Sequence, residues 1–206
     1  MKLTRSISRI VLTGALVAAT LVGTFAGSPA WAGRGSGSGL TALSADEAAM
    51  LTYMREEVKM ARDVYLVMYQ EWGAAIFFNI AASEQRHMDT MKKMLDKYGL
   101  PDPAQPAAGV FTNPDLQEKF DLLVSSGSLS CVDALYAGAT IEEIDMIDIQ
   151  HAIDITTHRD LLRAYQNLLE GSKNHLRAFV RALAAQGITY VPQYISQELY
   201  DAIIGS

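Results

Sequence analysis

Glutamate and histidine residues at helical spacing are the side chains of this sequence best suited to chemistry. Glu84 and His87 form a Glu-x-x-His pair, which places a carboxylate and an imidazole one turn apart on one helix face. Helical bundles that hold two metal ions use this spacing. Alone the motif is weak evidence, because many helices contain it by chance. The residues around it, and those on neighbouring helices, decide its meaning.

Each of four predicted helices carries a polar residue within an apolar face. At about 100° per residue, Glu57 lies in the middle of the face that includes Met50 and Met68. Glu143 lies near the centre of a later face and Glu142 on its flank, so we select Glu143. The candidate metal ligands are therefore Glu57, Glu84, His87, Glu143 and His175.

Other charged residues on these helices are predicted to point away from the apolar faces. A solvated face is the ordinary explanation for such residues. The residues in this group are Lys59, Arg62, Asp63, Asp145 and Asp148.

Three inward carboxylates favour a bound cation. Carboxylates in one core repel one another and are costly to desolvate unless positive charge neutralises them. Carboxylate and imidazole ligands together suit iron, manganese or zinc better than copper(I). We therefore expect one or two ions of iron or manganese. Open coordination positions would allow an oxidoreductase reaction with dioxygen or peroxide, with Tyr53 or Tyr65 nearby as a redox-active phenol.

A metal-free bundle is the alternative interpretation. In that case the inward Glu and His residues form a hydrogen-bonded polar core, and the surface binds another component of the cell envelope. A histidine on an apolar face is often a core residue with a satisfied hydrogen bond. The metal content of the protein separates the two interpretations.

Four long helices are the elements that must position these residues. Ser44 and Glu47 form a capping box at the start of the first helix, and Gly73 and Gly99 end the first two. The fold class is an all-α antiparallel four-helix bundle, with a short extra helix in the crossover between helices 2 and 3 and a tail that packs back on the bundle. The predicted long helices span 44–72, 75–98, 130–153 and 158–186, and the short helix spans 114–127.

Residues 1–32 have the pattern of a secretory signal peptide. Three basic residues precede an uncharged apolar run from Ile10 to about Phe25, and Ala30-Trp31-Ala32 has the small residues of a cleavage site. An uncleaved membrane anchor is the alternative. We expect cleavage after Ala32, a flexible linker over 33–43 and the bundle domain over 44–206. The protein would then be secreted or held in the periplasm or cell envelope.

Charge and cysteine content narrow the class of partner. The formal net charge is −6, and it becomes more negative when the basic residues of the signal peptide are removed. This balance argues against nucleic acid and, after cleavage, against an anionic membrane surface, but is compatible with metal ions. Cys131 is the only cysteine, so the domain cannot close an internal disulfide. The pattern is compatible with a homodimer.

Several longer segments carry a family resemblance. They include REEVKMARDVYLVMYQEWG (55–73), NIAASEQRHMD (79–89), IEEIDMIDI (141–149) and NLLEGSKNHLRAFVRAL (167–183). Through them the chain resembles the ferritin-like superfamily, and within it the prokaryotic family known as domain of unknown function 2202 (DUF2202). The resemblance covers nearly all of the chain after the predicted signal peptide. It implies a ferritin-like four-helix fold, but the family has no established activity to carry over.

Two positions depart from the wider superfamily. Ferritin and rubrerythrin place the first-helix glutamate seven residues before a tyrosine, whereas Val58 stands seven before Tyr65 and Glu57 stands eight before it. A second Glu-x-x-His pair is replaced by Ser172-x-x-His175. The predicted site therefore has one carboxylate fewer than the superfamily pattern.

Overall fold

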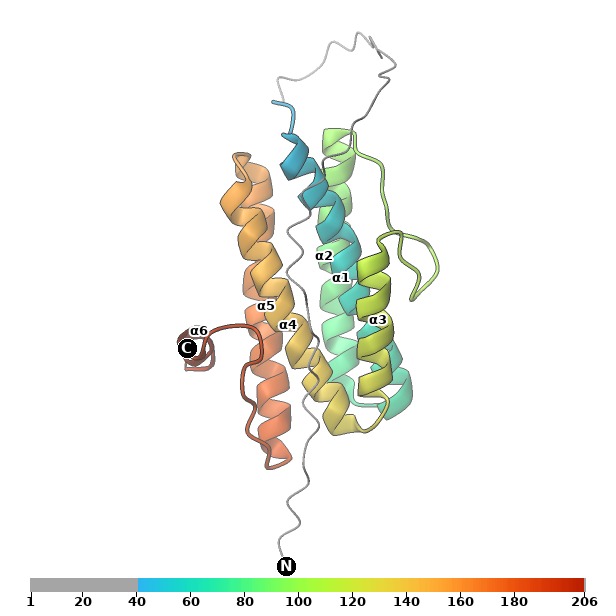
Figure 1. Ribbon diagram of the computed structural model, residues 1–206, viewed down its shortest axis with the longest axis vertical. Helices are drawn as coiled ribbons and strands as arrows, with labels where there is room; N and C mark the ends of the chain where they lie inside the picture. The colour runs from blue at the N-terminus through green and yellow to red at the C-terminus, as the bar shows by residue number, and fades with distance from the viewer. Residues whose placement is uncertain (1–40, 206) are drawn as a thin grey trace, which may run out of the picture. The chain divides into compact units, whose positions relative to one another are not determined.

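Six α-helices and no strands make up the part of the chain that the structure describes, residues 41–205 of a computed structural model (Figure 1). The predicted signal peptide (1–32) and most of the predicted linker (33–43) lie outside the described residues. No described helix combines the length and the apolar character needed to cross a membrane. The helices are α1 (Ala45–Trp72), α2 (Ala75–Tyr98), α3 (Pro114–Gly127), α4 (Cys131–Ile155), α5 (Arg159–Ala185) and α6 (Gln197–Ile204).

The four long helices lie along one another as an all-α helical bundle. Helix α1 packs on α2, and α4 packs on α5. Contacts of α1 with α4 and of α2 with α5 join the two pairs. The short helix α3 lies in the connection between α2 and α4 and packs against α1 and α4 (Figure 1). The predicted all-α class and the position of the short helix are therefore confirmed.

Capping residues fix where the helices begin and end. The Ser44 hydroxyl accepts a hydrogen bond from the backbone N–H of Glu47, and the Glu47 carboxylate accepts one from the backbone N–H of Ser44. Gly73 and Gly99 adopt φ angles of 65° and 69°, which glycine reaches without steric cost. Asn113 caps α3, which begins at Pro114. These local preferences explain why the sequence predicted the helix ends to within about two residues.

The core consists of two apolar clusters with a polar layer between them. One cluster contains Phe77 and Ile80 of α2 and Phe179 of α5, and the other contains Met91 of α2 and Leu161 of α5. Along α2 the boundary between the clusters falls at 84–87, and along α5 it falls at 172–175. The candidate ligands on these two helices therefore lie at the level where the apolar core is interrupted.

The sequence predicted that the outer face of α1 is exposed to solvent. In the structure this face is covered. Lys59 and Asp63 are each 1% exposed. The Lys59 ammonium donates to Asp63 and to the backbone carbonyls of Ala107 and Val110, so that charge and hydrogen bonds are satisfied together. Residues 100–113 thus fold over α1, which a helical wheel of α1 alone cannot reveal.

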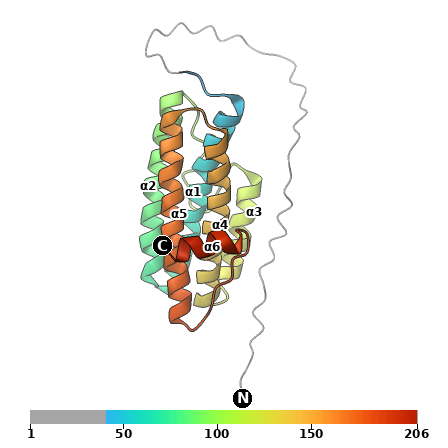
Figure 2. The ribbon, with the colours of Figure 1, turned by 90° about the vertical axis from the view of Figure 1, so that its left-hand side faces the viewer.

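The C-terminal segment packs back on the bundle and adds a short helix that the sequence analysis did not include. Tyr190 and Tyr200 are buried, and helix α6 contacts α5. Figure 2 shows α6 crossing the outside of α4 and α5. The segment extends the apolar cluster that contains Phe179 and covers part of α4.

Candidate metal centre

Three helices bring two carboxylates and one imidazole together inside the bundle. Glu84 of α2, Glu142 of α4 and His175 of α5 each offer one ligand atom, and these atoms lie within 4.8 Å of one another. The three residues are 1%, 0% and 8% exposed, respectively. The Nδ1 atom of His175 lies 2.9 Å from Glu84 Oε1 and 3.4 Å from Glu142 Oε2. The group is therefore compact and shielded from water.

The three converging atoms have no hydrogen-bond partner. Glu84 Oε1, Glu142 Oε2 and His175 Nδ1 are close enough for charge contacts but are not aligned as hydrogen bonds. A buried polar atom without a partner costs about 1–3 kcal/mol, and more when it is charged. Three such atoms meeting at one point fit a group that accepts a cation.

The other oxygen of each carboxylate is held in place. Glu84 Oε2 lies 3.1 Å from His87 Nδ1. Glu142 Oε1 accepts a hydrogen bond of 2.6 Å from the buried Tyr65 hydroxyl. Each glutamate is thus oriented by one oxygen and presents the other to the centre, as metal ligands with supporting hydrogen bonds do.

Histidine 87 lies at the edge of the group, close to α5. Its ring centroid is 5.9 Å from that of His175. A Cβ atom at Gly171 would lie 2.5 Å from His87 Cε1, so the absence of a side chain at this position makes room for the ring. His87 is therefore a neighbour of the three-residue group and not one of its converging ligands.

The electrostatics of the group couple its members tightly. Burial alone would lower the pKa of His175, but the carboxylates of Glu142 and Glu84 outweigh burial and raise the pKa to about 10. Burial would raise the pKa of Glu84, yet His175 and His87 lower it to about 2. The pKa of Glu142 is raised, chiefly by burial. In the metal-free protein the imidazole thus carries part of the positive charge that a cation would supply.

A second acidic group lies next to the first and contains Glu57. Tyr53 donates its hydroxyl to Glu57 Oε1 at 3.1 Å and also lies 3.2 Å from Asp148 Oδ2. Burial, followed by the charges of Asp148 and Asp145, raises the pKa of Glu57 well above its usual range. The predicted ligand Glu57 therefore points inward, but it joins Asp148 and Tyr53 instead of the three-residue group.

The structure does not bring Glu143 to the metal group. Its carboxylate accepts the Tyr190 hydroxyl at 2.6 Å and the backbone N–H groups of Gln193, Tyr194 and Ile195 at 2.6–3.0 Å. Both oxygens are therefore used to hold the C-terminal segment. Of the five predicted ligands, Glu84, His87 and His175 come together and Glu57 lies beside them. Glu143 points instead to the C-terminal segment.

Glu142 and Asp145 are the site residues that the sequence analysis did not select. Helix α4 is buried on both sides, by α1 and α5 on one and by α3 and the C-terminal segment on the other. Its apolar residues consequently surround the helix, and the centre of the apolar face does not mark the core. The three-residue spacing of Glu142 and Asp145, which matches that of Glu84 and His87, is a signal in the sequence that the apolar-face argument did not use.

The donor set determines what the centre can do chemically. Two carboxylate oxygens and one or two imidazole nitrogens suit a divalent first-row transition metal better than a copper(I) ion. Three or four protein ligands leave coordination positions open for water or a small substrate. The residues present therefore fit a metal ion, and the unpartnered atoms Glu84 Oε1 and Glu142 Oε2 support that fit.

An all-α bundle with a buried carboxylate and histidine group defines the class of this protein. A family model described as an uncharacterized protein domain (DUF2202) matches residues 47–206. The chain belongs to this family.

An archaeal relative shares both the sequence and the fold. The uncharacterized protein MJ0754 of Methanocaldococcus jannaschii is 50% identical over 165 residues, which cover 80% of this chain and 89% of the relative. The crystal structure of the hypothetical protein MJ0754 superimposes with a TM-score of 0.80 at 49% identity and covers 83% of this chain and 98% of that one. The described fold is therefore that of a solved structure.

Proposed function

We propose that this protein binds a divalent transition-metal ion, iron or manganese, through Glu84, Glu142 and His175, with His87 as a further ligand. The observation that carries the proposal is the convergence of three buried ligand atoms without hydrogen-bond partners. A cation between them would give each of the three atoms a partner and would neutralise two buried carboxylates.

The proposal includes a ferritin-like arrangement of the four long helices and export from the cytoplasm. The arrangement is supported by the sequence resemblance and by the order of two long helices, one short crossover helix and two further long helices. Export is supported by the basic, apolar and small-residue segments of residues 1–32. If the ion is redox-active, it would supply electron exchange with dioxygen or peroxide at its open positions.

The chain offers a matched pair of variants to test the metal site. Glu142→Gln removes the charge of a proposed ligand, whereas Glu143→Gln makes the same change at the adjacent residue, where the amide oxygen still accepts backbone hydrogen bonds. We expect wild type and Glu143→Gln to contain near-stoichiometric metal and Glu142→Gln to lose at least 90% of it. The charge of a carboxylate ligand supplies much of the affinity for a divalent cation. A loss of about 1.4 kcal/mol in binding free energy already lowers the affinity about 10-fold.

Elemental analysis makes the measurement. The protein is expressed with its signal peptide and purified without a chelator or an affinity tag, so that neither removes nor adds metal. Wild-type protein with less than a tenth of an ion per chain after incubation with iron(II) or manganese(II) would support the metal-free bundle. Wild-type metal content in Glu142→Gln would mean that Glu142 is not a ligand.

Export makes a separate prediction. Cleavage after Ala32 should leave a mature chain that begins at Gly33. The intact mass of protein recovered outside the cytoplasm of a bacterial host measures this directly. A chain that still begins at Met1 would contradict the prediction, and a variant with Ala30→Leu, which spoils the small-residue site, serves as the uncleaved control.

A further inference from the structure

Three acidic residues of α4 form a line toward the candidate metal centre. Asp148, Asp145 and Glu142 follow one another at intervals of three residues, so their side chains are neighbours on one side of the helix. Asp148 is half-buried, whereas Asp145 and Glu142 are 2% and 0% exposed. The line therefore begins at the rim of the bundle and ends at a proposed metal ligand.

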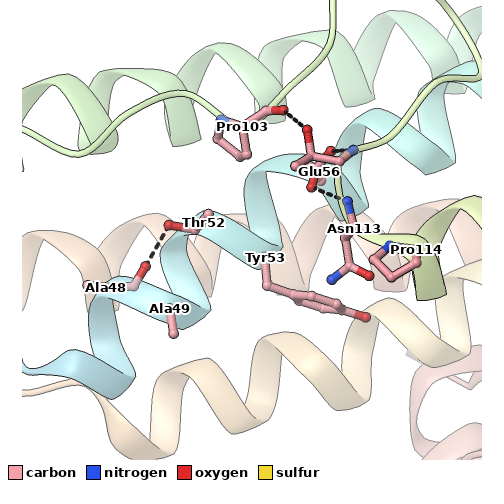
Figure 3. A pocket seen from close by; sticks show the side chains of 9 residues that line it. Ala48, Ala49, Thr52, Tyr53, Glu56, Pro103, Asn113 and Pro114 are labelled. Carbon is pink, nitrogen blue, oxygen red and sulfur yellow. Dashed lines mark hydrogen bonds between the residues drawn. The ribbon is translucent and has the colours of Figure 1, made fainter. Parts of the chain in front are cut away.

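Tyr53 stands at the outer end of this line. Its side chain lines two surface hollows, of about 460 and 290 Å³. Figure 3 shows the ring projecting from α1 past Asn113 and Pro114. Its hydroxyl contacts Glu57 and Asp148 at 3.1 and 3.2 Å. One side of Tyr53 thus faces the surface hollows and its hydroxyl faces the buried acids.

Asp145 is the middle member and has an unused oxygen. Its Oδ1 atom is buried and has no hydrogen-bond partner. Burial, followed by the charges of Glu142, Glu84 and Asp148, raises the pKa of this carboxyl well above its usual range. A buried acid without a partner lowers the stability of the fold. No hydrogen bond within the described residues offsets this cost at Asp145 Oδ1. While a cation lies beside Asp145, this oxygen has a partner.

A lysine from α3 supplies positive charge to the outer end. Lys119 Nζ lies 3.0 Å from the Tyr53 hydroxyl. Its charge acts to lower the pKa of both Glu57 and Asp145, against the larger effect of burial. The ammonium therefore offsets part of the negative charge of these acids. It would also repel a metal cation that approaches along the same path.

We propose that Asp148, Asp145 and Glu142 form an entry route along which divalent cations move from the hollows at Tyr53 to the buried metal centre, and that Lys119 slows this entry. The proposal rests on the proposed metal-binding function. It assigns a role to the acids of α4 that are not ligands in the three-residue group. Negative charge on the approach to a site raises the local concentration of cations and their rate of entry by about 10- to 1,000-fold.

Cobalt(II) uptake tests the route, because cobalt has the charge of iron(II) and manganese(II) and its visible absorption reports coordination. Stopped-flow mixing of the full chain with cobalt(II) measures the rate, and titration measures the stoichiometry. We expect Asp148→Asn to slow uptake about 10-fold and Lys119→Met to accelerate it several-fold, with unchanged stoichiometry. Added salt should slow uptake by wild type more than by Asp148→Asn.

Asp154→Asn is the matched control. Asp154 lies on the same helix and carries the same charge, but it is exposed and lines a different hollow. Its uptake rate should stay within about twofold of wild type. The opposite signs expected for Asp148→Asn and Lys119→Met guard against an effect of unfolding, which would slow both variants.

The outcomes separate this inference from the proposed function. Wild-type protein that binds no cobalt at equilibrium would overturn the metal-binding function. Full stoichiometry with equal uptake rates in all four proteins would overturn the entry route alone. Cations would then enter elsewhere, and His87, with 15% of its side chain exposed, marks the alternative side between α2 and α5.

Discussion

Single residues decide which carboxylates can reach a metal ion. Glu142 and Glu143 are chemically identical neighbours, yet one presents an unpartnered oxygen to Glu84 and His175 while the other is fully used by Tyr190 and the C-terminal backbone. Hydrogen bonds of this kind satisfy both carboxylate oxygens without a metal. The partners of each oxygen therefore separate a ligand from a structural anchor more reliably than burial does.

Ser172 offers a way to extend the proposed site. It is 2% exposed and lies one turn before His175, where it can contribute only a neutral hydroxyl. Replacing it with Glu adds a carboxylate on the same helix face. We expect Ser172→Glu to raise the metal content toward two ions per chain and, without metal, to lower the melting temperature, because the added charge is buried.

Thermal melts with and without manganese(II) measure the effect of Ser172→Glu. Metal at about 100 times its dissociation constant should restore about 2.7 kcal/mol of stability by mass action on the folded state. Ser172→Gln is the size-matched control, which should lose about 1–3 kcal/mol through overpacking and gain no more from metal than wild type does. A Glu variant that melts like wild type and ignores metal would place residue 172 away from the centre.

The inward residues of α2 and α5 were predictable, whereas those of α4 were not. Helix α2 has one face against the core, so the centre of its apolar stripe marked Glu84 correctly. Helix α4 is enclosed on both sides, so the same reasoning favoured Glu143 over Glu142 and placed Asp145 in solvent. Tertiary contacts with the C-terminal segment, which no local pattern encodes, decide between the two neighbours.

At the scale of elements, Glu47 ties the start of α1 to the turn between α4 and α5. Its Oε1 atom accepts hydrogen bonds from the Thr157 backbone and the Thr156 hydroxyl and lies 2.8 Å from His158 Nδ1. Burial alone would raise the pKa of Glu47, but the hydrogen bonds with His158, Thr157 and Ser44 hold it well below its usual range. One carboxylate thus caps one helix and anchors the connection between two others.

Glu47→Gln should lower the free energy of unfolding by about 1.5–3 kcal/mol at pH 7, because it weakens charged hydrogen bonds. The folded pKa of Glu47 is depressed, so its contribution is fully present above the unfolded value of about 4.5 and is lost as pH falls below that value. The difference between wild type and variant should therefore narrow below pH 4.5. Urea unfolding at several pH values measures it.

Glu170→Gln is the control for this prediction. Glu170 forms an ion pair with Lys173, but its side chain is 63% exposed. Exposed pairs contribute about 0–1 kcal/mol, so this variant should stay within about 0.5 kcal/mol of wild type at every pH. Equal destabilisation by the two variants would show that Glu47 acts only as a general surface charge.

The connection between α2 and α3 shows why solvent-facing residues were partly misassigned. Glu56 accepts the backbone N–H groups of Thr112 and Asn113, the second of which is drawn in Figure 3. Asp63 accepts the backbone N–H of Gly109. The charged residues of α1 thus satisfy an irregular segment that has few internal hydrogen bonds of its own. Helix ends depend on local caps and were predictable. The burial of charged residues on α1 depends on the backbone of residues that are distant in the sequence, and was not.

For the whole molecule, the polar layer between the two apolar clusters holds both the candidate metal centre and the buried charges that destabilise the fold. Each cluster is stabilised by burial of apolar side chains such as Phe179 and Leu161. The layer between them holds several carboxylates and therefore weakens the metal-free bundle. Bound metal should stabilise the whole domain, since the ligands come from α2, α4 and α5 and link the two helix pairs.

The anchoring of the C-terminal segment at Glu143 has a consequence for the rotation of α4 about its own axis. Successive helical residues point about 100° apart, so rotating α4 by that angle in one sense would aim Glu143 where Glu142 now points and carry Glu142 away from the centre. The four hydrogen bonds at Glu143 oppose that turn. The C-terminal segment supplies none of the three ligands. It nevertheless fixes the rotation of α4 about its axis, and therefore the direction in which Glu142 points.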